Sequence, residues 1–300
     1  MIKSNQSNKN LNRISRFALV KFIWKWKVVT SSMIGLHFYK TAFGQAHYKK
    51  IQLLKKSKLI RDVVDPDSLR YFYSVTKDGF LLIKGSLPAI IADGFKSESI
   101  IHDAESSAIQ YWMGCFLCRS QEQIITEQEI RHCDSSKLHP LLPKTKDHRP
   151  DGYFVFDENQ NEVSLIAFEY DRSRKPKELF GPVNYFYENY PAIKKVIWVT
   201  DSRSNAVRLH DELKKSSEHS FTKHVFFILE EFLKKGFESR SFDGRLLLKD
   251  LLKSTGNTLE IDRKSISLNQ LLSPEKAPFR QLLKNFRLQN KNVMTPHIHT

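Results

Sequence analysis

The chain of 300 residues is 40% hydrophobic and 12% aromatic, which is enough for one large domain or two ordinary domains with buried cores. Its 48 Lys and Arg outnumber its 33 Asp and Glu, and the resulting charge of +15 favours a polyanionic partner over an acidic small molecule. Nucleic acid is the first candidate for this partner, and a membrane surface is the rival. No apolar run approaches the ~20 residues that a membrane-spanning helix needs, and no secretion signal is recognisable. We therefore expect a cytoplasmic protein that does not enter a membrane.

The positive charge is concentrated at the amino-terminal end. The first sixty residues hold thirteen Lys and Arg and no Asp or Glu. Such a block is either a solvated arm or a folded surface that meets phosphates, and hydrophobic periodicity decides between the two. Residues 1–12, rich in Ser, Asn and Lys, indicate a flexible basic arm, whereas apolar residues at helical spacing begin at Ile14. A folded basic unit is therefore expected to follow the arm.

Residues 13–96 have the pattern of a winged-helix DNA-binding domain. The expected elements are helices over 14–26, 31–38 and 45–58, strands over 59–64 and 70–75, and a further helix capped by Thr76. In a winged helix-turn-helix the third helix enters the major groove and the hairpin, or wing, touches the DNA backbone. The sequence predicts that arrangement here.

The third helix carries a polar stripe. Tyr48, Ile51 and either Leu54 or Lys55 are expected to face inward. Polar residues recur on another face at steps of four, three and four, and form the expected groove face: Gln45, Lys49, Gln52 and Lys56. Arg70 is expected to contact DNA from the wing. Winged helices also serve as protein-binding modules and a lysine-rich face can be merely solvated, so the absence of acids over sixty residues is what favours DNA.

Residues 97–236 have the pattern of an α/β domain. The expected elements are a helix capped by Ser97 or Ser99, strands over 123–130, 153–156 and 165–171, a helix over 176–190, a strand over 193–201, a helix over 204–215 and a strand over 225–229. This order places helical layers on the faces of a sheet. Residues 237–300 are expected to form a basic helical extension, with helices over 242–253 and 278–288.

Acidic residues gather at one edge of the expected sheet. Glu169 and Asp171 project from the same side of their strand because side chains alternate with a period of two. The simplest register of the hairpin brings Asp151 to the same edge. Three carboxylates at one spot repel unless a cation lies between them, and hard oxygen ligands suit Mg²⁺ or Mn²⁺. Such an ion can activate water and stabilise the charge that develops on a phosphate.

A further acid lies on the first helix of this unit. Glu105 shares a face with His102, Ile109, Trp112 and Phe116. This carboxylate therefore either faces a cleft or lies at the boundary of an ordinary amphipathic helix.

The order of these features resembles a known nuclease core. Helical Glu105 is followed by Arg149-Pro150-Asp151-Gly152, then by Phe168-Glu169-Tyr170-Asp171, and then by a helix and an apolar strand, which is similar to the PD-(D/E)XK nucleases. With the preceding winged helix, the chain more narrowly resembles the replication-relaxation family. Those plasmid-borne proteins are linked to plasmid replication and mobilisation and include accessory components of the relaxosome. The resemblance covers roughly residues 14–229.

The resemblance implies roles for particular residues. Asp151 and Glu169 match the metal-binding acids of the nuclease motif, and Glu105 matches a helical acid that some members have. Asp171 stands where active nucleases normally have a lysine that positions the attacking water. A carboxylate cannot perform that electrostatic role.

Basic residues follow the acidic end of this strand. Either Lys175 or Lys177 could replace the absent lysine, since that residue migrates within this fold. Arg172 and Arg174 are suited to bidentate contacts with phosphate.

Two functions are compatible with these patterns. In the first, the protein is a DNA-binding accessory protein of plasmid mobilisation or replication, and a relaxase or a replication protein performs the chemistry. In the second, it is a Mg²⁺-dependent endonuclease of a restriction system or of a mobile element, where transposition proteins would be its partners. A protein that recognises palindromic sites would act as a homodimer, which nothing in the sequence demonstrates.

Overall fold

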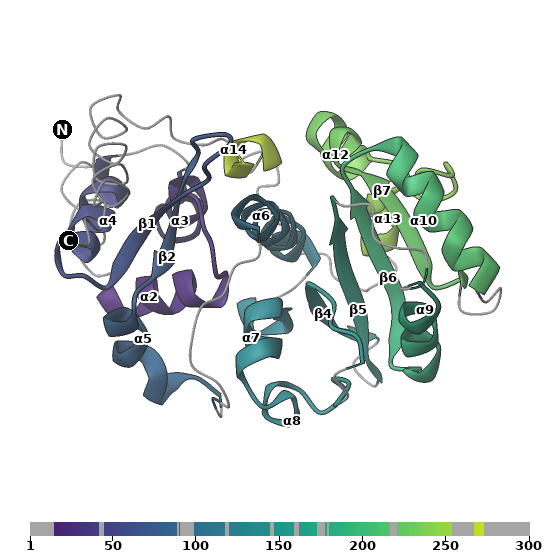
Figure 1. The fold of residues 1–300 in the computed structure, drawn as a ribbon, viewed down its shortest axis with the longest axis horizontal. Coiled ribbons are helices and arrows are strands. Elements are labelled where there is room, and N and C mark those ends of the chain that lie inside the picture. The colour runs from purple at the N-terminus through teal and green to yellow at the C-terminus, as the bar shows by residue number, and fades with distance from the viewer. Residues whose placement is uncertain are drawn as a thin grey trace, which may run out of the picture.

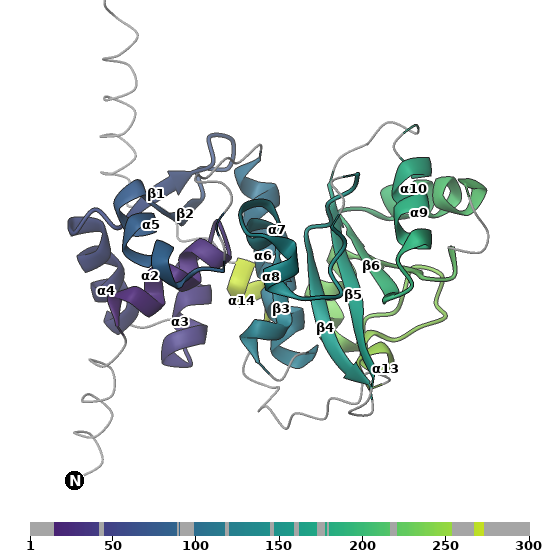
Figure 2. The same cartoon turned by 90° about the horizontal axis from the view of Figure 1, so that it is seen from below.

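The computed structural model describes residues 15–41, 45–88, 90, 99–117, 120–144, 147–158, 162–172, 178, 180–216, 221–253 and 267–272. Within these ranges the chain is a mixed α/β protein with a two-stranded and a five-stranded sheet. Figure 1 shows the amino-terminal helices and the small sheet on one side, the large sheet on the other, and α6 (Ile100–Leu117) between them. The same order of layers is visible at right angles in Figure 2.

The amino-terminal unit begins with three helices close to the predicted spans. They are α2 (Arg16–Lys25), α3 (Ser31–Tyr39) and α4 (Gln45–Lys56). Ser15 caps α2 by accepting a hydrogen bond from the backbone N–H of Ala18, and Thr30 caps α3 in the same way through Met33. Both helices therefore begin where a hydroxyl oxygen satisfies a free N–H group. The predicted arm, residues 1–12, lies outside the described residues.

An antiparallel hairpin follows α4, as predicted. Its strands are β1 (Ile60–Val64) and β2 (Tyr71–Val75), and they are followed by α5 (Lys77–Ile83) and the 3₁₀ turn η1 (Lys84–Ser86). Val29, between α2 and α3, forms an antiparallel bridge to Tyr73. The backbone between the first two helices is thereby tied to the hairpin. Thr76 caps α5 by accepting from the N–H of Gly79.

Helix α6 is the central layer of the molecule. On one side, the ring of Tyr111 meets the ring of Trp26 edge-on, with 5.4 Å between centroids. On the other side, Trp112 belongs to the same buried cluster as Phe154 and Phe168 of the large sheet. One continuous hydrophobic core therefore joins the amino-terminal unit to one face of the sheet.

The large sheet has the strand order β3-β4-β5-β6-β7. Its strands are β3 (Ile124–Thr126), β4 (Gly152–Glu158), β5 (Glu162–Asp171), β6 (Ile193–Thr200) and β7 (His224–Ile228). The first three strands are antiparallel, whereas β6 and β7 run parallel to β5. Parallel neighbours require crossover connections, and the helices that provide them are α9 (Phe180–Asn189) and α10 (Arg203–Ser216).

The side chains of β5 alternate between the two faces of the sheet. Phe168 and Tyr170 belong to the core shared with α6, whereas Ala167 belongs to a second core beneath α9 and α10. By the same period, Glu169 and Asp171 share the face of Ala167. The structure confirms the strand through Asp171 that this prediction requires.

Gly152 lies where α6 approaches the start of β4 most closely. A Cβ atom at this position would lie 1.9 Å from Nε2 of Gln110, which in turn donates a hydrogen bond to the carbonyl of Ile125. The glycine of the Arg-Pro-Asp-Gly segment is therefore required by packing between helix and strand.

The described part of the carboxyl-terminal segment returns to α6 and to the amino-terminal unit. Its elements are α12 (Leu229–Lys235), η4 (Gly236–Glu238), α13 (Leu248–Lys253) and α14 (Leu268–Leu272). In both views α14 lies beside α6, and the carbonyl of Leu271 accepts a hydrogen bond from the Thr30 hydroxyl at 2.9 Å. The described residues beyond 236 therefore complete the core. The helix predicted over 278–288 lies outside the described residues.

Three predicted elements differ from the structure. The strand predicted over 123–130 ends at Thr126, because Thr126 and Glu129 form a capping box that starts α7 (Glu127–His132). The helix predicted over 242–253 begins only at Leu248, since a turn with Gly244 at a φ of 75° precedes it. The helix predicted over 176–190 is described from Phe180 onward. The remaining short elements are η2 (Gln121–Gln123) and α8 (Ser135–Leu138).

Candidate functional site

The outer face of α4 carries the predicted polar stripe. The four polar residues of the stripe are all exposed: Gln45, Lys49, Gln52 and Lys56. Together with Tyr48 and Leu53 they line an open hollow along the helix. Leu53 is exposed although it is apolar, and the sequence analysis did not single it out. This face therefore combines amide, ammonium and apolar groups.

The inner face of α4 is buried through His47, Ile51 and Leu54. Ile51 and Leu54 were predicted to face inward, whereas His47 was not. The imidazole of His47 fits against Gly35 of α3, where an added Cβ atom would lie 3.1 Å from Cε1 of the ring. Tyr48 is only half-buried. A Cβ atom at Gly35 would also lie 2.4 Å from the carbonyl oxygen of Thr41, so the glycine lets α3 pack closely against the chain that follows it.

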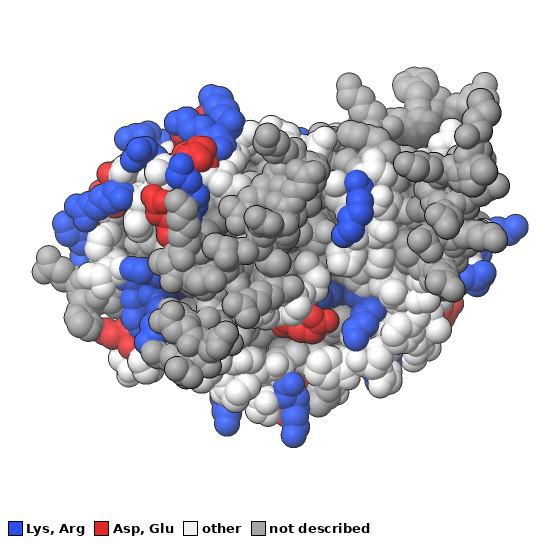
Figure 3. Space-filling model, turned by 180° about the vertical axis from the view of Figure 1, so that it is seen from behind, with Lys and Arg blue, Asp and Glu red and all other residues white. Residues whose placement is uncertain are grey.

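The charge on α4 is largely unbalanced by acids. Lys55 pairs with Asp62 of β1 at 2.5 Å, but no acidic side chain among the described residues forms an ion pair with Lys49 or Lys56. On α12, by contrast, lysines pair with glutamates one turn away: Lys234 with Glu230 and Lys235 with Glu231. Figure 3 shows acidic side chains among the basic ones on the end of the molecule that carries α12. The excess positive charge is therefore available on α4.

Glu105 faces the amino-terminal unit and β5. The hydroxyl of Tyr170 donates a hydrogen bond to Oε2 of Glu105 at 2.6 Å. Arg70, at the start of β2, lies 3.7 Å from Oε1, and Arg172 lies 3.4 Å from Oε2. Arg70 therefore points back from the hairpin to α6, and both arginines meet the acid that was expected to hold a metal ion.

Glu169 and Asp171 lie on the opposite face of the sheet, where both are buried. Glu169 Oε1 accepts a hydrogen bond from the hydroxyl of Tyr187 on α9 at 2.5 Å and lies 2.5 Å from Nε2 of His148. The backbone carbonyl of Asp171 accepts from the side-chain amide of Asn205 on α10. The sheet therefore separates these two acids from Glu105. Lys175, Lys177 and Arg174 lie outside the described residues.

Asp151 occupies the end of the sheet between the two faces. Pairing of Gly152 with Phe168 puts it next to Glu169 in the register, as predicted, but its Oδ2 accepts a hydrogen bond from the backbone N–H of Tyr170 at 2.6 Å. Burial raises the pKa of Asp151 to about 7, with the charge of His102 opposing the rise and that of Glu169 adding to it. This carboxyl group is therefore expected to lose its proton near neutral pH.

His102 is the cation nearest to this acid. Its Nε2 lies 3.0 Å from the carbonyl of Tyr170, and its Nδ1 lies 3.8 Å from Oδ1 of Asp103. Burial alone would lower the pKa of His102, but Asp103 and the charge of Asp151 outweigh that effect and raise the pKa to about 9. The imidazole is therefore protonated at neutral pH and balances the neighbouring carboxylates.

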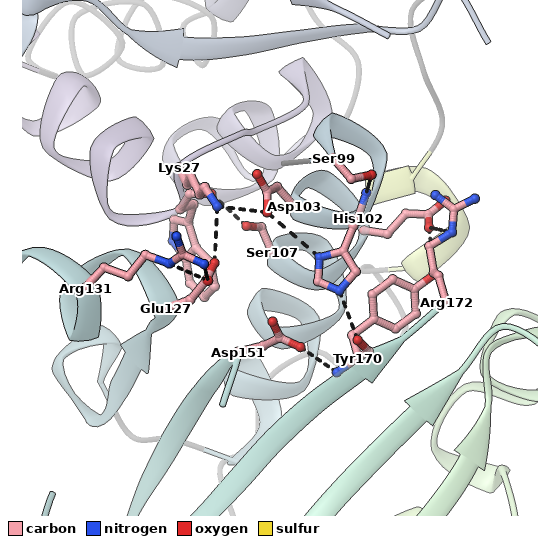
Figure 4. A network of polar contacts seen from close by, with 12 residues as sticks. Lys27, Ser99, His102, Asp103, Ser107, Glu127, Arg131, Asp151, Tyr170 and Arg172 are labelled. Atoms are coloured by element: carbon pink, nitrogen blue, oxygen red, sulfur yellow. Dashed lines mark hydrogen bonds and ion pairs between the residues drawn. The ribbon is translucent and has the colours of Figure 1, made fainter. Parts of the chain in front are cut away.

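A buried lysine that the sequence analysis did not single out completes the network. Lys27 lies 2.9 Å from Asp103 and 3.2 Å from Glu127, and Glu127 also pairs with Arg131 at 2.6 Å. Figure 4 shows Lys27, Glu127 and Arg131 on one side of His102, and Tyr170 and Arg172 on the other. The sequence gives only a weak indication that Lys27 is buried, because this lysine stands inside the apolar run that begins at Trp24.

The described carboxylates are thus distributed over separate partners. Glu105 meets two arginines and a tyrosine hydroxyl, Glu169 meets a histidine and a tyrosine hydroxyl, and Asp103 meets a lysine. Among the described residues, no group of three His, Cys, Asp or Glu side chains is arranged to hold a metal ion. The described residues therefore show no such group at the predicted convergence of Asp151, Glu169 and Asp171. They also do not bring Glu105, which the resemblance added to the metal ligands, to the face of Glu169.

In the part of the chain that the structure describes, no helix combines the length and the apolar character needed to cross a membrane. Comparisons of this chain with models of protein families, with curated proteins and with solved structures find no match.

Proposed function

We propose that the protein is a DNA-binding accessory protein of the kind that serves plasmid mobilisation or replication. The amino-terminal unit acts as a winged helix, with α4 in the major groove of duplex DNA. The α/β unit acts as a nuclease-like domain that contributes backbone or partner contacts, while a relaxase or replication protein performs the chemistry in the cytoplasm. The observation that carries this proposal is the outward stripe of α4, whose two lysines form no ion pair with an acidic side chain of the described residues.

The chemistry of the α4 stripe matches the edges and the backbone of duplex DNA. Glutamine amides such as those of Gln45 and Gln52 can pair with adenine in the major groove, and an exposed apolar group such as Leu53 can contact the methyl group of thymine. Lys49 and Lys56 neutralise phosphates and release counterions, which makes the affinity depend on salt. The three helices and the hairpin, tied together by Val29, have the chain order of a winged helix-turn-helix.

The α/β unit supports a nuclease-like role in the order of its elements. Helix α6, the antiparallel strands β3 to β5, the crossover helix α9 and the parallel strand β6 follow the order expected for a PD-(D/E)XK core. The acids of that motif are nevertheless engaged: Glu169 by His148 and Tyr187, and Glu105 by the two arginines. Asp171 supplies a carboxylate where a lysine is required for chemistry. These features favour a domain that binds DNA over one that cleaves it.

The test is a fluorescence-anisotropy titration of labelled duplex DNA at low salt. The wild-type protein is expected to bind, and removal of two phosphate contacts in the variant Lys49→Ala/Lys56→Ala should weaken binding by on the order of tenfold or more. The matched control, Lys234→Ala/Lys235→Ala, changes the net charge equally on α12 and should bind like the wild type. Equal losses in both double variants would point to general charge attraction and contradict the proposal.

A Mg²⁺-dependent endonuclease is the second candidate, favoured by the register that puts Asp151 beside Glu169. Incubation of supercoiled plasmid with Mg²⁺ or Mn²⁺ distinguishes the two functions. Nicking that disappears in Asp151→Ala and Glu169→Ala would establish the endonuclease. Binding without nicking is the result expected for the accessory protein.

A further inference from the structure

Two arginines from different parts of the fold converge on one carboxylate. Arg70 comes from the start of β2 in the amino-terminal unit, and Arg172 follows β5 at the edge of the large sheet. Both approach Glu105 on α6, at 3.7 Å and 3.4 Å. The pair therefore lies on the seam where the two units meet.

Among the described residues, Glu105 is the ion-pair partner of both guanidinium groups. Arg70 and Arg172 are 37% and 40% exposed, whereas Glu105 is only 13% exposed. Each guanidinium carries five N–H donors, and the single carboxylate between them already accepts a short hydrogen bond from Tyr170 at 2.6 Å. Glu105 can therefore hold the two side chains in place, but it cannot satisfy their donors.

The charges around the seam are mixed. His102, one turn before Glu105 on α6, is kept positive by Asp103 and Asp151 and so adds no negative charge. Glu105 lies between the two guanidinium groups, and the charge of Asp201 also acts on Tyr170. Guanidinium groups are planar forks whose paired N–H donors match the oxygens of a phosphate.

We propose that Arg70 and Arg172 jointly bind one backbone phosphate of the DNA that α4 engages, and that Glu105 is a positioning residue that presents them. This inference rests on the proposed DNA-binding function. It extends the DNA from the face of α4 across the hairpin to the edge of the large sheet. It also assigns Glu105 to phosphate binding in place of the metal-binding role expected from the nuclease pattern.

The experiment measures duplex binding over a series of salt concentrations for Arg70→Ala, Arg172→Ala, the double variant and Glu105→Gln. The slope of log affinity against log salt changes by about 0.9 for each phosphate contact on duplex DNA. Each single variant should lower the slope by about 0.9 and weaken binding by about tenfold, and the double variant should lose little more, since one phosphate is shared. The matched control is Arg245→Ala, whose side chain is 83% exposed and lies 3.8 Å from Asp243.

Glu105→Gln separates positioning from a merely structural ion pair. Loss of the carboxylate charge removes the ion pairs that hold Arg70 and Arg172 and should weaken duplex binding by about fivefold. The amide oxygen can still accept the Tyr170 hydroxyl, so the fold is kept. A variant that folds, as judged by an unchanged melting temperature, yet binds as well as the wild type would contradict the positioning role.

The remaining outcomes are also decisive. Unchanged slopes in both arginine variants, with binding still sensitive to Lys49 and Lys56, would overturn the seam site and leave the proposed function standing. A fall of about 1.8 in the double variant would show two separate phosphate contacts and overturn the shared one. Loss of inorganic-phosphate binding with unchanged DNA binding would assign the arginines to free phosphate instead. A wild-type protein that binds no duplex would overturn the proposed function itself.

Discussion

Replacing Lys27 by Met tests how firmly the amino-terminal unit is fixed to the rest of the fold. The ammonium group of Lys27 is buried and lies 2.9 Å from Asp103 and 3.2 Å from Glu127, so it links the segment after α2 to α6 and α7. Methionine keeps the length and apolar volume of the side chain but removes the charge. The variant therefore isolates the electrostatic contribution.

The expected loss follows from the contacts that remain. Glu127 keeps Arg131 at 2.6 Å, and His102 lies 3.8 Å from Asp103. Removing one partner of a buried ion pair typically costs about 3–5 kcal/mol, and the partial compensation by His102 places the expected loss near the lower end, at about 3 kcal/mol.

Urea unfolding followed by tryptophan fluorescence at pH 7.5 measures the unfolding free energy that Lys27→Met loses relative to the wild type. Adding Asp103→Asn to Lys27→Met should restore more than half of the lost unfolding free energy, because position 103 then no longer carries the buried carboxylate charge that the ammonium group balanced. Lys234→Met, at an exposed ion pair on α12, should change the unfolding free energy by less than about 0.5 kcal/mol. A loss below about 1 kcal/mol in Lys27→Met, or no recovery in the double variant, would refute the reasoning.

Three further substitutions test the sheet. The pKa of Asp151 is raised to about 7, so its contribution to stability is complete below its ordinary pKa of 3.8 and is lost as pH rises through 7. The unfolding free energy of Asp151→Asn should therefore rise relative to that of the wild type between pH 4 and pH 8. Parallel pH profiles of the two proteins would contradict this. Gly152→Ala, whose Cβ would lie 1.9 Å from a side chain of α6, should lower the unfolding free energy by several kcal/mol in a urea titration. Gly181→Ala, whose Cβ would have nothing within 4 Å, should leave it unchanged. Equal unfolding midpoints of the two variants would disprove the packing argument. Tyr187→Phe removes the hydroxyl that donates to buried Glu169 and should lower the unfolding free energy by about 1–3 kcal/mol, while a melting temperature equal to that of the wild type would show that this hydrogen bond is dispensable.

The parts of the fold that follow from local periodicity were predictable. The repeat of polar residues on α4 determines which side chains turn outward, and the alternation on β5 puts Glu169 and Asp171 on one face. The hydroxyl cap at Thr30 marks the start of α3. The capping box of Thr126 and Glu129 was equally visible in the sequence, and it explains why the strand predicted there is short.

The partners of the charged residues could not be predicted in the same way. Glu105 and Glu169 lie on opposite faces of the sheet because α6 covers the face of Phe168 and Tyr170, and no local pattern specifies which face a helix covers. The ion pair of Lys27 and Asp103 joins residues that lie 76 positions apart in the sequence. The convergence of Arg70 and Arg172 likewise depends on how two units meet. Charged residues could therefore be predicted from the sequence more reliably than the side chains that contact them in the fold.

Placing a photo-cross-linking amino acid at Gln52, in the middle of the outward stripe of α4, asks whether this face touches DNA. Irradiation of the complex with duplex DNA is expected to give covalent adducts at Gln52 and none at Lys215, an equally exposed position near the end of α10. Adducts at Lys215 as abundant as those at Gln52, or an absence of adducts at Gln52 while the protein remains bound, would contradict the assignment of α4 to the DNA.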